Sequence, residues 1–192
     1  MSTYLIYKPF NMLSQFTREA PHHVTLADLA FDFAKNVYPV GRLDADSEGL
    51  LILTDDKSLN ARLLNPKNKQ AKTYWVQVEG APKAADLLPL KKGINVKIKG
   101  KIHSTAPAKA FLLKETPLLP PRNPPIRFRK SIPTTWISLT ITEGKNRQVR
   151  RMCAAIGFPV LRLVRVGLAG YFYGAGLLAN MKVGEIMPIR LT

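Results

Sequence analysis

Short apolar segments separated by turn residues run along the whole chain, and several of them alternate with the period of two that is typical of β-strands. Residues 4–8 predict a strand that Pro9 ends, because proline has no N–H to donate to a neighbouring strand. In residues 72–80 the alternation places Tyr74, Val76 and Val78 on one face. The other strands are expected at residues 50–54 and 135–142, around Val96 and around Phe111.

Helical spacing of apolar residues appears first in residues 25–37. Thr25 and Asp28 stand three residues apart, as in a capping box, and so predict the start of a helix there. A second, short helix is expected in residues 55–66, closed by Pro66. In the first helix, the residues expected to share one face are Leu26, Leu29, Ala30 and Phe33.

A third helix is expected after Asn146, whose side chain is of the type that caps helix N-termini. Gly157 suits the position just after its end, and Pro159 prevents its continuation. Three arginines spaced three or four residues apart form a cationic patch beside the apolar face, either a solvated surface or a phosphate-binding one. The apolar face comprises Val149, Met152, Cys153 and Ile156, and the arginines are Arg147, Arg150 and Arg151.

Strands outnumber helices in this pattern and do not alternate regularly with them, which favours an α+β fold with a mixed or largely antiparallel sheet. The chain has 192 residues, enough for one domain or for two lobes that share a core. Residues 116–133 contain six prolines and four Arg or Lys residues, too much proline for the interior of a helix or a central strand. We interpret this segment, the basic loop, as an ordered surface loop, with a plain connector as the alternative.

The positive charge of the chain indicates that its binding partner is a polyanion. Its 29 Lys and Arg against 13 Asp and Glu give a formal net charge of +16, which points to nucleic acid or an anionic membrane. The longest apolar runs fall far short of the ~20 residues of a membrane-spanning helix, and the N-terminus lacks the features of a signal peptide. A single cysteine, Cys153, excludes an internal disulfide, and the few histidines show no zinc-binding spacing. We therefore expect a soluble, cytoplasmic protein.

Five of the thirteen acidic side chains nevertheless fall within residues 41–56. Three interpretations are open: a solvated turn, a calcium site and a catalytic carboxylate. The spacing partly fits the calcium loop of an EF-hand, but the flanking residues are strand-like rather than helical. The catalytic interpretation rests on Arg42 and Asp44, which would point to the same side of an extended segment bounded by Gly41 and Gly49. A nearby cation keeps a carboxylate ionised, and an ionised carboxylate is a nucleophile.

Four motifs in order, YKPFNMLSQF, GRLDADSEGLLILTDD, AKTYWVQVEG and EGKNRQVRRMCAAIGFPVLRLVRVGL, resemble those of bacterial ribosomal RNA pseudouridine synthases, in the branch of the small-subunit synthase A. The resemblance covers nearly the whole chain, and the basic loop is similar to that of a synthase acting on the large subunit. It implies the pseudouridine synthase fold, a largely antiparallel mixed sheet spanning two α/β lobes with the active site in the central cleft. We expect residues 1–192 to form this single catalytic domain, without the N-terminal S4-like module that many relatives carry.

The resemblance also implies roles for individual residues. Asp44 matches the catalytic aspartate that attacks the target nucleoside, whether at the sugar C1′, at uracil C6 or through a glycal. Tyr74 matches the tyrosine that stacks on the base and is a candidate general base, and Arg150 matches the arginine that pairs with the aspartate. Arg42 matches a residue that helps to displace the flipped base, and Leu163 matches an apolar residue near the base. Ala45 departs from the larger or basic residue common in relatives, which questions an RNA contact there.

The expected reaction is the isomerisation of a uridine in 23S ribosomal RNA, naked or in a large-subunit precursor, by a monomer without a cofactor or metal. The rival hypothesis is a non-catalytic RNA-binding or ribosome-assembly protein; DNA binding is weaker still, because no helix-turn-helix or zinc motif appears. The side chains expected to contact RNA are Lys72, Arg122, Arg127, Arg129, Lys130, Lys145, Arg147 and Arg151.

Overall fold

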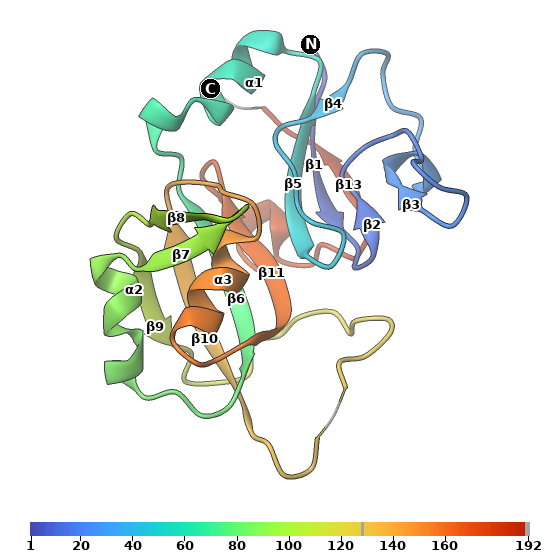
Figure 1. Ribbon diagram of the computed structural model, residues 1–192. Coiled ribbons are helices and arrows are strands. Elements are labelled where there is room, and N and C mark those ends of the chain that lie inside the picture. The colour runs from blue at the N-terminus through green and yellow to red at the C-terminus, as the bar shows by residue number, and fades with distance from the viewer. Residues whose placement is uncertain (128, 191–192) are drawn as a thin grey trace. The chain divides into compact units, whose positions relative to one another are not determined.

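The computed structural model describes residues 1–127 and 129–190 (Figure 1). The chain divides into two compact units, each formed around its own strands. Unit 1 contains Met1–Gln70 and the residues from Arg165 onward, and unit 2 contains Ala71–Val164. In the described residues, no helix is long and apolar enough to cross a membrane.

Unit 1 is built on β1 (Thr3–Lys8) and β5 (Glu48–Thr54), which pair antiparallel. On the other side of β1 lies β13 (Ile186–Pro188), and β4 (Tyr38–Pro39) pairs with β5. Every residue of β5 is buried, so this strand forms the centre of the core of unit 1. The remaining elements of the unit are β2 (Met12–Leu13), β3 (Val24–Thr25), η1 (Leu26–Asp28), α1 (Lys57–Leu64), η2 (Pro66–Asn68), β12 (Tyr171–Phe172) and η4 (Gly176–Leu178).

The helix expected in residues 25–37 is wrong beyond its first turn, because only the 3₁₀ turn η1 forms there. The capping interaction itself exists: the Asp28 carboxylate accepts a hydrogen bond of 2.8 Å from the backbone N–H of Thr25. Beyond it, Phe31 and Phe33 pack edge-to-face on Tyr4, with ring centroids 5.2 and 5.8 Å apart. The apolar residues of this segment therefore serve an aromatic cluster rather than one face of a helix.

Unit 2 contains three antiparallel strands in the order β6 (Lys72–Glu79), β10 (Thr134–Ile141) and β9 (Lys109–Leu112). A separate hairpin, β7 (Asn95–Ile98) and β8 (Lys101–Ser104), lies beside helix α3 (Gln148–Ala155) (Figure 1). The unit also contains η3 (Ala84–Leu87) and α2 (Leu88–Lys92). Strand β11 (Val160–Leu168) begins in unit 2 and ends in unit 1.

The expected strands at β1, β5, β6, β7, β9 and β10 are confirmed, as are α1 and the buried face of Tyr74, Val76 and Val78. The α+β class is also confirmed; β2 and β3 pair parallel, whereas the long strands of each unit pair antiparallel. The prediction that Asn146 caps α3 is wrong, because the helix begins at Gln148 after Arg147, which adopts the left-handed conformation. Gly157 does follow the end of the helix with a positive φ of 86°.

Candidate active site and RNA interface

Asp44 lies in a short loop of unit 1, residues 43–47, which we call the Asp44 loop. The side chain of Ser14 holds one flank: its Oγ accepts from the Leu43 N–H at 3.0 Å and donates to the Leu43 carbonyl oxygen at 2.9 Å. The other flank is held at Ala45, whose carbonyl oxygen accepts from the Asn11 N–H at 2.7 Å. The Ser47 N–H closes the turn on the Asp44 carbonyl oxygen at 3.0 Å. The backbone on both sides of Asp44 is thus fixed by residues 11–14.

Lys8 is buried beneath this loop, with no exposed surface. Its ammonium group donates to the carbonyl oxygens of Pro9 and Met12, both at 2.7 Å, and of Ala45 at 3.4 Å. Burial lowers the pKa of Lys8 to about 7, against the attraction of nearby carboxylates, of which Glu48 is the strongest and Asp46 and Asp44 follow. The Arg165 guanidinium lowers this pKa further. Lys8 therefore places a titrating positive charge within the electrostatic reach of Asp44.

Gly49 allows β5, the strand that follows the Asp44 loop, to pack closely against the backbone of Arg165. A Cβ at this position would lie 2.3 Å from the carbonyl oxygen of Arg165, and the φ of 102° is one that other residues rarely adopt. Arg165 is itself buried and donates from Nε to the Leu50 carbonyl oxygen at 2.7 Å. Arg42, just before the loop, is exposed, and its Nη2 donates to Gln15 Oε1 at 2.9 Å.

The other acidic residues of residues 41–56 have separate roles. Glu48 is buried at the start of β5, and the Asp55 carboxylate accepts from the Ser2 N–H at 2.7 Å. Asp56 caps α1 by accepting from the N–H groups of Ser58 and Leu59. No group of three or more potential metal ligands occurs in residues 1–127 and 129–190.

Unit 2 carries the other residues expected to act on the base. Tyr74 is buried on β6 opposite Leu139 of β10, and Leu163 is buried on β11. Arg150 is half-buried on α3, one residue beyond the buried Val149. Burial raises the pKa of the neighbouring Cys153 thiol to about 12, so that this sulfur is not a competing nucleophile at neutral pH.

The basic loop is anchored to the rest of unit 2 by arginines. Arg122 donates to the carbonyl oxygens of Pro124 at 2.8 Å and Leu161 at 3.4 Å. The buried Arg162 donates to the Pro120 carbonyl oxygen at 2.7 Å, and Arg129 pairs with Glu79 at 3.2 Å. The side chains of Arg127 and Lys130 are exposed, and Lys72 stands half-buried at the start of β6. These contacts hold the described parts of the loop, as expected for an ordered surface loop, and they use part of its positive charge.

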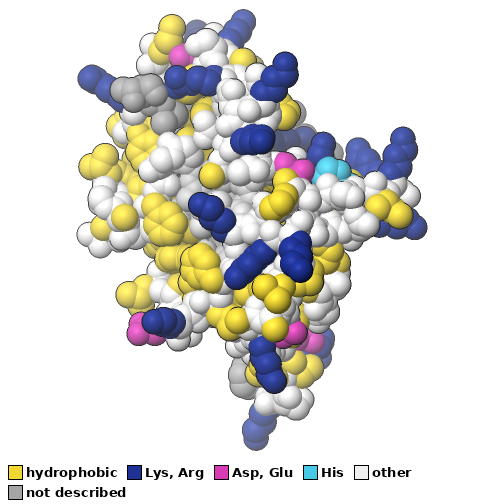
Figure 2. Space-filling model, turned by 90° about the vertical axis from the view of Figure 1, so that its left-hand side faces the viewer, with side chains coloured by type: hydrophobic (Ala, Val, Ile, Leu, Met, Phe, Trp, Pro, Cys, Tyr) yellow, Lys and Arg dark blue, Asp and Glu magenta, His cyan; other side chains and the backbone are white. Residues whose placement is uncertain are grey.

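Lys145 and Arg147 are exposed just before α3, in residues 143–147, which we call the α3 entry loop. Arg151 is half-buried and donates to the carbonyl oxygens of Lys97 at 2.7 Å and Asn146 at 3.2 Å, so it ties the hairpin and the entry loop to the helix. Figure 2 shows Lys and Arg side chains spread over one face of the molecule, with acidic side chains at few places. Such a surface suits a phosphate backbone.

Comparison with known proteins identifies the family to which the chain belongs. A family model described as RNA pseudouridylate synthase matches residues 2–155. The chain belongs to the RNA pseudouridylate synthase family. The resemblance inferred from the four motifs is therefore confirmed.

Two relatives share about half of the residues of this synthase, and both are called ribosomal large subunit pseudouridine synthase E. The protein from Vibrio vulnificus is 52% identical over 184 residues, which cover 96% of this chain and 73% of the relative. The protein from Xanthomonas axonopodis pv. citri is 52% identical over 168 residues, covering 87% and 85%. A solved structure, "Crystal structure of pseudouridylate synthase", matches with a TM-score of 0.77 and 26% identity over 98% of this chain and 70% of that one. The synthase therefore has the pseudouridine synthase fold and isomerises uridine to pseudouridine in RNA.

Sequence reasoning missed two residues that hold the Asp44 loop, Lys8 and Ser14. Lys8 gave one signal, a charged residue at the end of an otherwise apolar strand. Ser14 gave none, because its partner Leu43 lies 29 residues away along the chain.

Proposed function

We propose that this synthase converts one specific uridine of 23S ribosomal RNA to pseudouridine, with Asp44 as the nucleophile. The observation that carries the proposal is the fixed Asp44 loop, in which Ser14, Asn11 and Lys8 hold the backbone on both sides of one half-buried carboxylate. Nucleophilic catalysis needs such rigid placement, because small displacements of a reacting atom cost large factors in rate. The names of the relatives support the large-subunit substrate.

The proposed chemistry balances within one nucleoside. The bond between C1′ and N1 of uracil breaks, a bond between C1′ and C5 forms, and the proton leaves C5 while N1 gains one. The reaction is an isomerisation with no net oxidation or reduction, so the balance requires neither a redox cofactor nor ATP. The base leaves its stack to meet Asp44, at a cost of a few kcal/mol that protein contacts offset.

The remaining roles follow the family motifs residue by residue. Arg150 takes the role of the family's arginine that pairs with the catalytic aspartate. Tyr74 stacks on the flipped base and serves as the candidate general base, and Leu163 packs near that base. Arg42 helps to displace the base from its helix.

The proposed partner is 23S ribosomal RNA, and the synthase acts on it in the cytoplasm as a monomer. The exposed Arg127, Lys130, Lys145 and Arg147 supply phosphate contacts, and the basic loop contributes to the choice of site. The ordered tethers of this loop support that role, because an anchored loop presents its cations in a fixed pattern.

The test uses 23S transcript carrying tritium at uracil C5, and compares the wild type with Asp44→Asn. Conversion releases the label, so the wild type is expected to release tritium at one position, located by primer extension. Asp44→Asn removes the nucleophile and is expected to reduce release by at least about 10³-fold. Its affinity for the transcript should change little, because the substitution is isosteric and removes no cation.

Retained turnover in Asp44→Asn would remove Asp44 from the mechanism. No release by the wild type, on naked RNA and on large-subunit precursor particles alike, would favour the non-catalytic RNA-binding protein. Release from small-subunit RNA alone would contradict the proposed substrate while leaving the reaction intact.

A further inference from the structure

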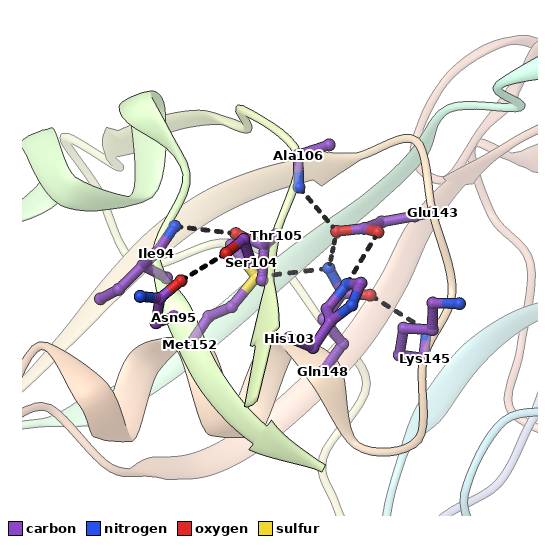
Figure 3. Close-up of polar contacts among 10 residues, drawn as sticks. All are labelled: Ile94, Asn95, His103, Ser104, Thr105, Ala106, Glu143, Lys145, Gln148 and Met152. Carbon is purple, nitrogen blue, oxygen red and sulfur yellow. Dashed lines mark hydrogen bonds and ion pairs between the residues drawn. The ribbon is translucent and has the colours of Figure 1, made fainter. Parts of the chain in front are cut away.

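Glu143 is the centre of a polar cluster in unit 2 that has no assigned role in the family resemblance (Figure 3). Its Oε1 accepts from the Ala106 N–H at 2.9 Å and from Gln148 Nε2 at 2.5 Å. Its Oε2 lies 3.1 Å from His103 Nε2 on β8. The carboxylate thus joins the residues before β9, the β7–β8 hairpin and the first residue of α3.

Gln148 passes this constraint on to the α3 entry loop. Its Oε1 accepts from the Lys145 N–H at 3.0 Å, and its own backbone N–H donates to the Lys145 carbonyl oxygen at 3.1 Å. The side chain is only 3% exposed, so it has no competing water along most of its length. Glu143 is the first residue of the α3 entry loop, so its contact with Gln148 links both ends of this loop to the residues before β9 and to the β7–β8 hairpin.

The entry loop needs such support, because its backbone is strained. Arg147 has φ 51° and ψ 31°, the left-handed conformation, which is unfavourable for a residue with a side chain. Arg147 is exposed and has no side-chain hydrogen bond that caps the helix. In this conformation the side chains of Lys145 and Arg147 are exposed, and the surrounding contacts are needed to maintain it.

The charge state of Glu143 is consistent with this function. Burial raises the pKa of the carboxyl group, but hydrogen bonds from Ala106, Gln148 and His103 outweigh burial, so the pKa lies below its ordinary value. The group is ionised at neutral pH and accepts from all three donors. A carboxylate near an RNA interface repels phosphate, so a role in RNA binding has to be an indirect one.

We infer that Glu143 is a positioning residue for RNA binding: through Gln148 it sets the conformation of the α3 entry loop, and thereby the places of Lys145 and Arg147. The inference rests on the proposed function, because it assigns these two cations to RNA phosphates. A positioning role and a simple electrostatic role of Glu143 predict opposite changes in the affinity for RNA. Removing a negative charge should tighten RNA binding, whereas loss of positioning should weaken it.

The experiment measures the affinity for 23S transcript and its salt dependence for Glu143→Ala. The affinity is expected to fall by roughly 10-fold, and the slope of log affinity against log salt to decrease by up to about two, one for each lost phosphate contact. Glu115→Ala is the matched control, because it removes the same charge from an exposed position in unit 2. Its affinity should be unchanged or slightly higher.

Two further variants separate positioning from general destabilisation. In a Lys145→Ala/Arg147→Ala background, adding Glu143→Ala is expected to cause no further loss, because the cations that it positions are gone. Glu143→Gln keeps an acceptor for Ala106 and Gln148 and is expected to retain most of the wild-type affinity. If Glu143→Ala does not fold, Gln148→Met takes its place, since it preserves volume and breaks the same chain of contacts.

An unchanged or tighter affinity in Glu143→Ala, or an equal loss in the background without Lys145 and Arg147, would overturn the inference. Neither result depends on turnover. A wild type that binds 23S transcript without releasing tritium would refute the proposed function and leave this test of Glu143 intact.

Discussion

The Asp44 loop and the basic loop are both irregular, yet they are held in opposite ways. The Asp44 loop is fixed at adjacent residues, through hydrogen bonds from the buried Ser14 and Lys8 to its backbone. The basic loop is held at widely separated points, at Pro120 by Arg162 and at Arg129 by Glu79. The difference is consistent with the proposed roles, because a reacting carboxylate has to be placed within a fraction of an ångström, whereas a long RNA backbone tolerates cations on a looser frame.

Among the substitutions that test this comparison, Ser14→Ala is expected to have the largest effect. It leaves the buried N–H and carbonyl groups of Leu43 without their partner, and so loosens the backbone next to Asp44. We expect kcat to fall by about 10- to 100-fold, the range for a displaced reacting group, with the affinity for RNA unchanged. Single-turnover tritium release at saturating RNA measures the effect.

Ser58→Ala, on the exposed start of α1, is the control. Equal rates in the two variants would show that the backbone beside Asp44 needs no support from Ser14.

Lys8 gives a prediction about stability, because burial lowers its pKa in the folded chain to about 7, from the ordinary lysine value of 10.5. Between these values the unfolded chain binds more protons than the folded one, so the free energy of unfolding rises as the pH increases above 7. From pH 7 to 9 this single group should contribute about 2 kcal/mol, an increase that Lys8→Met lacks.

Urea unfolding of the wild type and Lys8→Met at both pH values measures this difference. Lys57→Met, which changes an exposed lysine of α1, should keep the pH dependence of the wild type. Parallel pH profiles for the wild type and Lys8→Met would mean that Lys8 is protonated to the same extent in the folded and unfolded chains.

The smallest effect is expected at the Arg129–Glu79 tether. Its side chains are 47% and 24% exposed, so solvent screens the pair strongly. A double-mutant cycle of Arg129→Gln and Glu79→Gln should give a coupling energy of about 0.5 kcal/mol or less, decreasing with added salt. A coupling several times larger, insensitive to salt, would place the basic loop in the same rigid class as the Asp44 loop.

Local periodicity was sufficient to predict most strands and the buried face of α3, because these depend on neighbours in sequence. The family was inferred from the resemblance of four motifs and not from periodicity. It failed in residues 25–37, where apolar spacing suited a helix but the phenyl rings pack on Tyr4 instead. It also missed the supports of the site. Lys8 meets the Ala45 carbonyl oxygen across 37 residues, and His103 meets Glu143 across 40. Pairings between such distant segments leave no periodic signal.

The left-handed backbone at Arg147 has a consequence for how this position could vary. Glycine or asparagine would adopt φ 51° more easily, so a protein optimised only for thermal stability would carry one of them there. Arginine at this position places a guanidinium beside the start of α3 at some cost in the stability of the fold. Under the proposed role of Arg147 in binding RNA phosphates, a variant made more stable by glycine or asparagine at position 147 would bind RNA more weakly.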